Sequence, residues 1–240
     1  MTKQKKLELS PRLQLLADWV QPGVRIADVG TDHAFLPVWL ALQGRVSGAI
    51  ASDLREGPLA RGAETAREYG AAHLVETRLC GGLDAIRPEE VDTVIIAGMG
   101  GETIVHILEK APWTADGSHT LLLQPMSKVE MLREFLAGNG YEIVREQLVQ
   151  DRGTVYPVME IRAGHMCPTR GQLHAGVKLL HDPLQERALI EKIIRAQAVV
   201  ANLNRTGRPA DQVKADDYRD LIGELLMMRE EWRHANCPSN

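Results

Sequence analysis

The stretch Ile26-Ala27-Asp28-Val29-Gly30-Thr31-Asp32-His33-Ala34 decides the fold of this chain. Its apolar residues predict a strand that ends at Gly30, and Phe35 and Leu36 begin a helical pattern after the polar turn. A strand, a tight turn and a helix in this order direct backbone N–H groups, and the positive end of the helix, into a crevice outside the carboxyl end of the strand. The stretch therefore predicts an entrance for a nucleotide-like cofactor.

This turn lacks two of the three glycines of a dinucleotide-binding fingerprint. Asp32 stands where the second glycine would fall, and no glycine stands at the third position, so the turn loses its closest approach to a diphosphate and gains a carboxylate. A carboxylate disfavours a pyrophosphate and favours a cationic or hydroxylated ligand. S-adenosylmethionine, which carries a sulfonium, an ammonium group and a ribose, meets this requirement better than NAD.

Length and composition limit the classes of protein that this chain can belong to. With 240 residues and 44% hydrophobic content it can bury one full core, with room for a second compact unit. A net charge of −4 gives no global signal for nucleic acid. Cys80, Cys167 and Cys237 have no disulfide or metal spacing, and residues 1–6 lead into no apolar segment. We expect a cytoplasmic protein with no membrane association and no metal.

Strand and helix patterns alternate up to residue 164. Strands are predicted at 25–30, 48–53, 75–79, 93–97 and 120–123, with helices after Ser10 as an N-cap and at 36–42, 57–69, 104–108 and 129–137. Two further segments, 141–149 and 155–162, alternate polar and apolar residues around a short turn, which is typical of an antiparallel hairpin. The pattern predicts an α/β fold of the Rossmann-like class I methyltransferase type, with a mostly parallel sheet and a terminal antiparallel hairpin.

Two further strand ends carry candidate site residues. Asp53 ends the second predicted strand, roughly 20 residues past the first turn. In this architecture an acidic residue at that place hydrogen-bonds the ribose hydroxyls of the cofactor. Gly98-Met99-Gly100-Gly101 follows the fourth strand, where glycines allow a ligand to approach the backbone and Met99 offers a soft apolar contact to a base or to a sulfonium methyl group. A plain strand-to-helix turn that needs glycine explains the same residues equally well.

The composition changes from residue 165 onward. Residues 165–183 read as a loop-like connector, and two later apolar series, in 184–203 and 218–232, repeat at alternating spacings of four and three. They predict an antiparallel two-helix coiled coil, and hence domains at 1–164 and 165–240. The hairpin either serves packing alone or binds RNA phosphates. The candidate phosphate partners are Lys178, Arg187, Lys192, Arg195, Arg205, Arg208 and Lys214.

Five segments resemble the TrmK-type bacterial tRNA (adenine-N1)-methyltransferases. They are Leu9-Ser10-Pro11-Arg12-Leu13, and residues 28–37, 51–53, 96–101 and 123–125. The resemblance covers residues 9 to about 162, and the hairpin matches that family's tail in layout only. It implies an S-adenosylmethionine-dependent domain with a coiled-coil tail that methylates N1 of adenine 22 in the D-arm of tRNA. Gly81 and Met126 depart from the family pattern, and Gly81 removes one expected hydrogen bond to the cofactor adenine.

The turns and the resemblance together assign the candidate site. Asp32 and Met99 are the catalytic candidates, although Asp32 could instead act as a helix N-cap. The predicted cofactor contacts are Asp28, Gly30, His33, Asp53, Leu54, Gly82, Gly98 and Gly100. The predicted substrate contacts are Arg12, Gly101, Gln124 and Pro125, with Arg12 reaching a tRNA phosphate or a cofactor carboxylate unless it is merely solvated.

Two other functions stay open from the sequence. An NAD-dependent reductase would also use Asp53, but the glycines it needs at the first turn and a Tyr-x-x-x-Lys pair are missing. A non-catalytic S-adenosylmethionine-binding adaptor with a coiled coil would keep the first turn and could dispense with Gly98–Gly101. The oligomeric state is also open, and a monomer is favoured.

Overall fold

The computed structural model describes residues 7–236, so the amino-terminal residues 1–6 and Cys237 lie outside the described residues. The chain divides into two compact units. The first runs to Arg145 and resumes at Val149–Met166, and the second comprises Glu146–Leu148 and the chain from Cys167 onward. The expected boundary at 164/165 lies two residues before the division at Met166, while the assignment of Glu146–Leu148 to the second unit was not expected.

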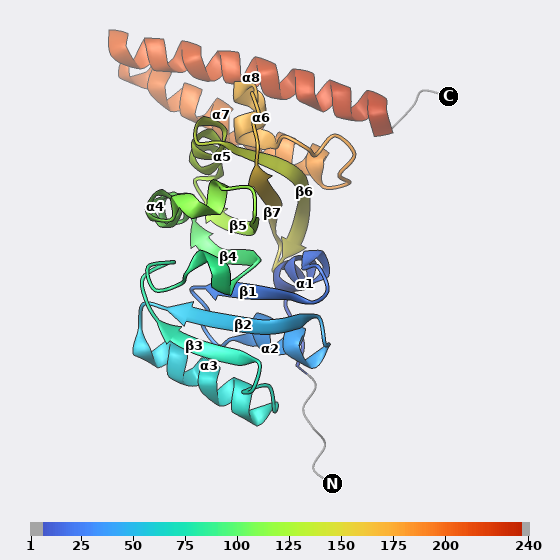
Figure 1. Ribbon diagram of the computed structural model, residues 1–240. Helices are drawn as coiled ribbons and strands as arrows, with labels where there is room; N and C mark the ends of the chain where they lie inside the picture. The colour runs from blue at the N-terminus through green and yellow to red at the C-terminus, as the bar shows by residue number, and fades with distance from the viewer. Residues whose placement is uncertain (1–6, 237–240) are drawn as a thin grey trace. The chain divides into compact units, whose positions relative to one another are not determined.

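The first unit contains a seven-stranded sheet (Figure 1). Its strands are β1 (Val24–Val29), β2 (Val46–Asp53), β3 (Val75–Leu79), β4 (Thr93–Gly100), β5 (Thr120–Ser127), β6 (Tyr141–Asp151) and β7 (Thr154–Ala163). Its helices are α1 (Pro11–Trp19), α2 (Phe35–Leu42), α3 (Glu56–Glu68), α4 (Gly101–Lys110) and α5 (Val129–Gly138), with short 3₁₀ turns η1 (Pro88–Glu90) and η2 (Pro112–Ala115).

The strand order is β3-β2-β1-β4-β5-β7-β6. The pairs β1–β2, β1–β4, β2–β3 and β4–β5 are parallel, and β5–β7 is antiparallel. The order reverses between β1 and β4, and a ligand crevice forms outside the carboxyl ends of the strands at such a reversal. The predicted Rossmann-like fold with a terminal antiparallel hairpin is therefore confirmed.

The central strands are held by burial on both faces. Ile95, Ile96, Leu122 and Leu123 are fully buried, which is why short continuous apolar runs form β4 and β5. At the outer end of this sheet, the Arg145 guanidinium lies over the Trp19 ring, 4.2 Å from its centroid.

No helix of the described chain combines the length and the apolar character that a membrane span requires.

One local prediction at a strand end was wrong, and one at a helix end was confirmed in position only. The segment Gly98–Gly100 is not a turn: β4 continues through it, because Met99 pairs with Pro125 and Gly100 with Ser127 on β5, with irregular register. Ser10 does occupy the N-cap position of α1, with Pro11 after it, but its hydroxyl makes no capping bond and is buried without a partner.

The first turn also differs from the prediction. The N-cap position of α2 belongs to Ala34, which adopts a left-handed conformation with φ of 53°. Its N–H donates to the Thr31 hydroxyl at 3.0 Å. Because Thr31 closes this turn, the alternative role of Asp32 as an N-cap is excluded.

The second unit is built from α6 (Arg170–Ala175), α7 (Gln185–Thr206) and α8 (Pro209–Asn236). Figure 1 shows α7 and α8 side by side as a hairpin, and Leu189, Ile193, Leu221 and Leu225 are buried between them. The connector is not wholly loop-like as predicted. It contains α6, because Thr169 and Gln172 form a reciprocal capping box that starts a helix there.

Candidate cofactor and acceptor site

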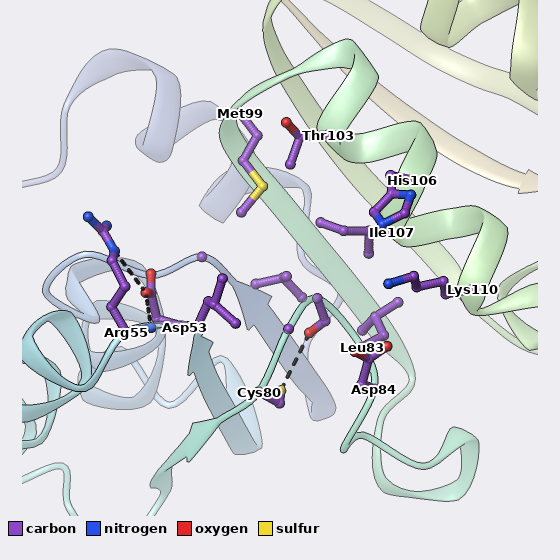
Figure 2. Close-up of a pocket in the computed structure, with 15 residues that line it drawn as sticks. Asp53, Arg55, Cys80, Leu83, Asp84, Met99, Thr103, His106, Ile107 and Lys110 are labelled. Carbon is purple, nitrogen blue, oxygen red and sulfur yellow. Dashed lines mark hydrogen bonds and ion pairs between the residues drawn. The ribbon is translucent and has the colours of Figure 1, made fainter.

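A cavity of about 440 Å³ lies at the carboxyl ends of β1, β2 and β3. Figure 2 shows Asp53 at the left, Met99 above it, Ile107 at the right, and Leu83 and Asp84, which come from the loop after β3, below Ile107. This volume is within the range of small-molecule sites. Of the predicted site residues, the structure brings Gly30, Asp53, Leu54, Gly82 and Met99 together around this cavity.

Asp53 is the buried acid of the cavity. It ends β2, and its side chain is 8% exposed. One carboxylate oxygen, Oδ1, accepts the Arg55 backbone N–H at 2.8 Å and lies 3.4 Å from the Arg55 Nε. The turn after β2 therefore holds the carboxylate at the strand end, where it can accept hydrogen bonds from a pair of hydroxyls.

Gly30, directly after β1, and Met99, near the end of β4, meet at the same edge of the sheet as Asp53. Gly30 has a φ of 76°, and a Cβ there would overlap the Met99 methyl group. The Met99 side chain therefore lies directly on the Gly30 backbone. A side chain at Gly30 would be strained by the positive φ and would have to displace the flexible end of the Met99 side chain.

Leu54, Leu83 and Ile107 supply apolar walls to the cavity. Leu54 is 75% exposed on the wall of the cavity. Ile107 packs closely on the loop after β3, because a Cβ at Gly82 would lie 2.9 Å from its Cγ1. A flat apolar group such as a purine fits between such walls.

Sequence reasoning missed one face of α4. Thr103, His106, Ile107 and Lys110 all line the cavity and follow the spacing of one helical face. That spacing, directly after the glycine segment 98–101, was the signal that could have identified them.

Sequence reasoning also missed Asp84. Its Oδ2 lies 3.2 Å from the position that a Cβ at Gly81 would take. A carboxylate therefore stands beside the position where the family pattern places Asn or Asp. The signal was an acidic residue three positions further along the same loop.

Asp28 lies behind the cavity rather than on it. It is buried, and burial raises the pKa of its carboxyl to about 6, against the opposing effect of its hydrogen bond with Thr31. Since Thr31 also accepts the Ala34 N–H, Asp28 supports the first turn from inside.

Asp32 and His33 lie outside the cavity lining. Asp32 is 66% exposed and pairs with Arg61 at 2.7 Å, and this hydrogen bond keeps the pKa of Asp32 below its usual range. The His33 ring stacks on Phe35 with centroids 5.0 Å apart, and its Nε2 lies 3.5 Å from the Asp32 carboxylate. Asp32 is thus a charged, accessible carboxylate at the first turn.

The remaining predicted residues form a second group near the ends of β4 and β5. Arg12 donates to Gln124, which also accepts the Gly98 N–H. Gly100 and Pro125 lie in the β4–β5 ladder, and Gly101 packs against the Lys128 backbone. Most of the predicted site residues therefore belong to two groups, a cavity and a hydrogen-bonded network, and Met99 lies in the strand segment that is common to both. Asp28, Asp32 and His33 belong to neither group.

Three comparisons place this geometry among known proteins. Residues 9–159 match a family described as methyltransferase domain. The chain is 36% identical over 159 residues to a tRNA (adenine(22)-N(1))-methyltransferase of Bacillus subtilis, covering 66% of this chain and 67% of the relative.

Two solved structures share the fold over most of the chain. One is the Bacillus subtilis m1A22 tRNA methyltransferase TrmK, with a TM-score of 0.87, 27% identity, and coverage of 93% of this chain and 100% of the other. Another is a putative tRNA (m1A22) methyltransferase of Streptococcus pneumoniae in complex with S-adenosyl-L-methionine, with a TM-score of 0.80, 28% identity, and coverage of 92% and 100%. The chain belongs to the methyltransferase domain family, and within it to the TrmK-type tRNA (adenine-N1)-methyltransferases.

Proposed function

We propose that this chain transfers a methyl group from S-adenosylmethionine to N1 of an adenine in tRNA, at position 22 of the D-arm. The observation that carries the proposal is the cavity at the carboxyl ends of β1 and β2. Gly30, Asp53 and Met99 line this cavity, and the chain belongs to the methyltransferase domain family. The TrmK proteins that it matches in fold support the choice of tRNA and of the position.

The residues around the cavity fit S-adenosylmethionine. The buried Asp53 carboxylate suits ribose hydroxyls, the apolar walls at Leu54 and Ile107 suit the adenine, and the Asp84 carboxylate suits an exocyclic amine. Because Met99 approaches Gly30 closely, a ligand that reaches Gly30 must either contact the Met99 thioether or displace it. We infer that Gly30 and Met99 border the reacting end of the cofactor.

The chemistry demands alignment more than acid or base catalysis. Bound S-adenosylmethionine supplies a methyl group on an electrophilic sulfonium. Adenine N1 carries a lone pair, so attack requires no prior deprotonation, and the protein must chiefly orient the two reactants. Met99 would offer an apolar contact at the point of transfer, and the charged Asp32 would offset the positive charge that develops on the adenine.

The alternative functions differ in what the cavity would do. A reductase of the NAD type needs an open glycine turn for a diphosphate, whereas here Met99 covers Gly30 and the family is that of methyltransferases. A non-catalytic adaptor would bind S-adenosylmethionine and transfer nothing. Cytoplasmic location and a monomeric state stay predictions.

The test is methyl transfer to a defined transcript. We expect purified protein and radiolabelled S-adenosylmethionine to label an unmodified tRNA, and digestion to nucleosides to release the label as 1-methyladenosine. A transcript in which guanine replaces adenine 22 should stay unlabelled. Cofactor binding without transfer to any tRNA would favour the adaptor, and label on another base or at another position would overturn the stated site.

Asp32→Asn is expected to lower methyl transfer at least about tenfold, or ~1.4 kcal/mol in the barrier, because the amide keeps the shape but loses the charge. The melting temperature should stay unchanged, since Thr31 rather than Asp32 closes the turn. The measurement is turnover at saturating tRNA and cofactor.

Arg61→Gln is the matched control for this prediction. It removes the Arg61 partner and leaves the Asp32 carboxylate in place. Wild-type turnover in Asp32→Asn would refute the catalytic role, and an equal loss in both variants would assign the effect to their ion pair.

The hairpin of α7 and α8 is the proposed tRNA-binding surface, because one adenine in tRNA must be chosen through RNA shape and backbone over a wide area. Arg195, Arg208 and Lys214 are exposed on it. Replacing these three residues with glutamine should raise the KM for tRNA about tenfold or more and make its salt dependence shallower, with cofactor affinity unchanged.

Arg229→Gln is the control on the same hairpin, because Arg229 is not one of the candidate phosphate partners and pairs with Glu186 at 3.1 Å. It should change the KM for tRNA much less than the triple variant does. An unaltered KM and salt slope in the triple variant would make the hairpin a purely structural element.

A further inference from the structure

We infer that Arg12 is a positioning residue for methyl transfer. Through Gln124 it fixes the Gly98 backbone N–H, and this fixes the segment of β4 whose Met99 side chain packs on Gly30. The inference rests on the proposed function for the reaction itself, and on the hydrogen bonds of the first unit for the role of Arg12.

Arg12 is bound on two edges by the protein. Its Nε donates to the Asp151 carboxylate at 2.7 Å, and its Nη1 donates to the Gln124 Oε1 at 2.6 Å. Its guanidinium also lies over the Tyr156 ring, 5.5 Å from the centroid. The side chains of Arg12 and Asp151 are only 22% and 7% exposed, so the pair is largely removed from water.

Gln124 connects Arg12 to β4 through its side-chain amide. It is fully buried, and its Oε1 accepts both the Arg12 guanidinium and the Gly98 backbone N–H, the latter at 3.2 Å. Its Nε2 donates to the Pro125 carbonyl at 3.0 Å. With both ends of the amide engaged, the side chain has one orientation, and that orientation places its acceptor at Gly98.

Gly98 needs this support because the β4–β5 ladder is irregular there. Gly98 has a φ of 76°, and the register shifts between Ala97 and Met99. The next side chain along the strand is that of Met99, which covers Gly30. A change in the Gly98 peptide would therefore move Met99 relative to the strand end where the reactants must be aligned.

The same contacts argue against Arg12 as a reader of tRNA phosphates, its predicted role. If Arg12 turned toward a phosphate, it would leave the Asp151 carboxylate buried without its cation, which is strongly unfavourable. It would also leave Gln124 without one donor. These hydrogen bonds direct the charge of Arg12 toward the interior of the protein.

The experiment compares Gln124→Leu with Gln124→Glu. Leucine removes the acceptor at nearly constant volume. Glutamate keeps an oxygen for both Arg12 and Gly98 and loses the Nε2 donation to the Pro125 carbonyl. We expect Gln124→Leu to lower kcat about 10- to 100-fold, because small misplacements of reactants have effects of this size, and Gln124→Glu to retain most of the activity. The Kd for S-adenosylhomocysteine and the KM for tRNA should both stay within about threefold of wild type.

Arg12→Lys tests the competing role. A lysine keeps the charge but cannot hold Asp151 and Gln124 in the same fork, so kcat should fall while the salt dependence of the KM for tRNA stays unchanged. Arg67→Lys, an exposed residue on α3, is the control and should match wild type. A higher KM for tRNA with a shallower salt slope in Arg12→Lys would overturn the inference, since it would mean that Arg12 contacts a phosphate.

Amide hydrogen exchange separates this inference from the proposed function. The Gly98 N–H should exchange faster in Gln124→Leu than in wild type or Gln124→Glu, at equal melting temperature. Unchanged Gly98 exchange, or unchanged kcat in Gln124→Leu, would refute the positioning role. An inactive wild-type protein with the expected exchange pattern would instead refute the proposed reaction and leave the network of Arg12 established.

Discussion

Replacing Asp53 with alanine is expected to weaken binding of S-adenosylhomocysteine about 10- to 100-fold, with the fold intact. The Asp53 carboxylate is 8% exposed and faces the cavity at the end of β2. Charge-assisted hydrogen bonds from ribose hydroxyls to such a group contribute about 1.5–3 kcal/mol, which corresponds to this range. Calorimetric titration of the purified variant measures the change.

Asp116→Ala is the matched control, because Asp53 also has a local structural bond. Asp116 accepts the backbone N–H of Ser118 at 2.8 Å, just as Asp53 accepts that of Arg55, but it lies outside the cavity lining. Asp116 also contacts the buried His119 Nδ1 at 3.0 Å, so Asp116→Ala should lower the melting temperature at least as much as Asp53→Ala does. Only Asp53→Ala should lose affinity. Equal affinities in the two variants would contradict the assignment of Asp53 to the cofactor.

The second large effect is expected from Gly101→Ala, which should destabilise the protein by about 2–4 kcal/mol and lower its melting temperature by roughly 5–15 °C. A Cβ at Gly101 would overlap the Lys128 carbonyl oxygen, and it would lie 2.9 Å from the Lys128 carbonyl carbon and 3.0 Å from the Ser127 oxygen. These are backbone atoms, so relief requires α4 to move away from the end of β5.

Because α4 carries Thr103, His106, Ile107 and Lys110 into the cavity, this variant should also bind S-adenosylhomocysteine more weakly. Gly138→Ala is the control: Gly138 ends α5, and a Cβ there meets open space. That substitution should be neutral or stabilising by about 0.4–1 kcal/mol. A melting temperature for Gly101→Ala equal to that of Gly138→Ala would show that the contact at Lys128 relaxes freely.

Much of the fold could be predicted because its signals are local. The apolar runs at 94–96 and 121–123 identified buried strands, and the breaks at Gly30 and Asp53 identified two strand ends that border the cavity. Parallel strands in this architecture place their carboxyl ends at one edge, so two strand-end residues predicted separately could be expected to meet.

The errors arise where distant segments decide the local structure. Gly98–Gly100 reads as a turn, yet it pairs with β5. From the sequence Arg12 is expected to be an exposed cation, yet it forms an ion pair with Asp151, 139 positions away. Asp84 and the cavity face of α4 carry no strand-end signal and were missed.

The sequence by itself determined the order of the elements, the class of fold and the break at Gly30 that follows β1. These depend on hydrophobic period and on turn residues, which act over a few positions along the chain. Only the tertiary structure decided that Thr31 rather than Asp32 closes the first turn, that Met99 lies on Gly30, and that Arg12 is held by Asp151 and Gln124. The physical reason is that the partner of a polar or flexible side chain depends on which atoms the packing brings within about 3 Å of it. The periodicity of a single segment gives no information about that distance.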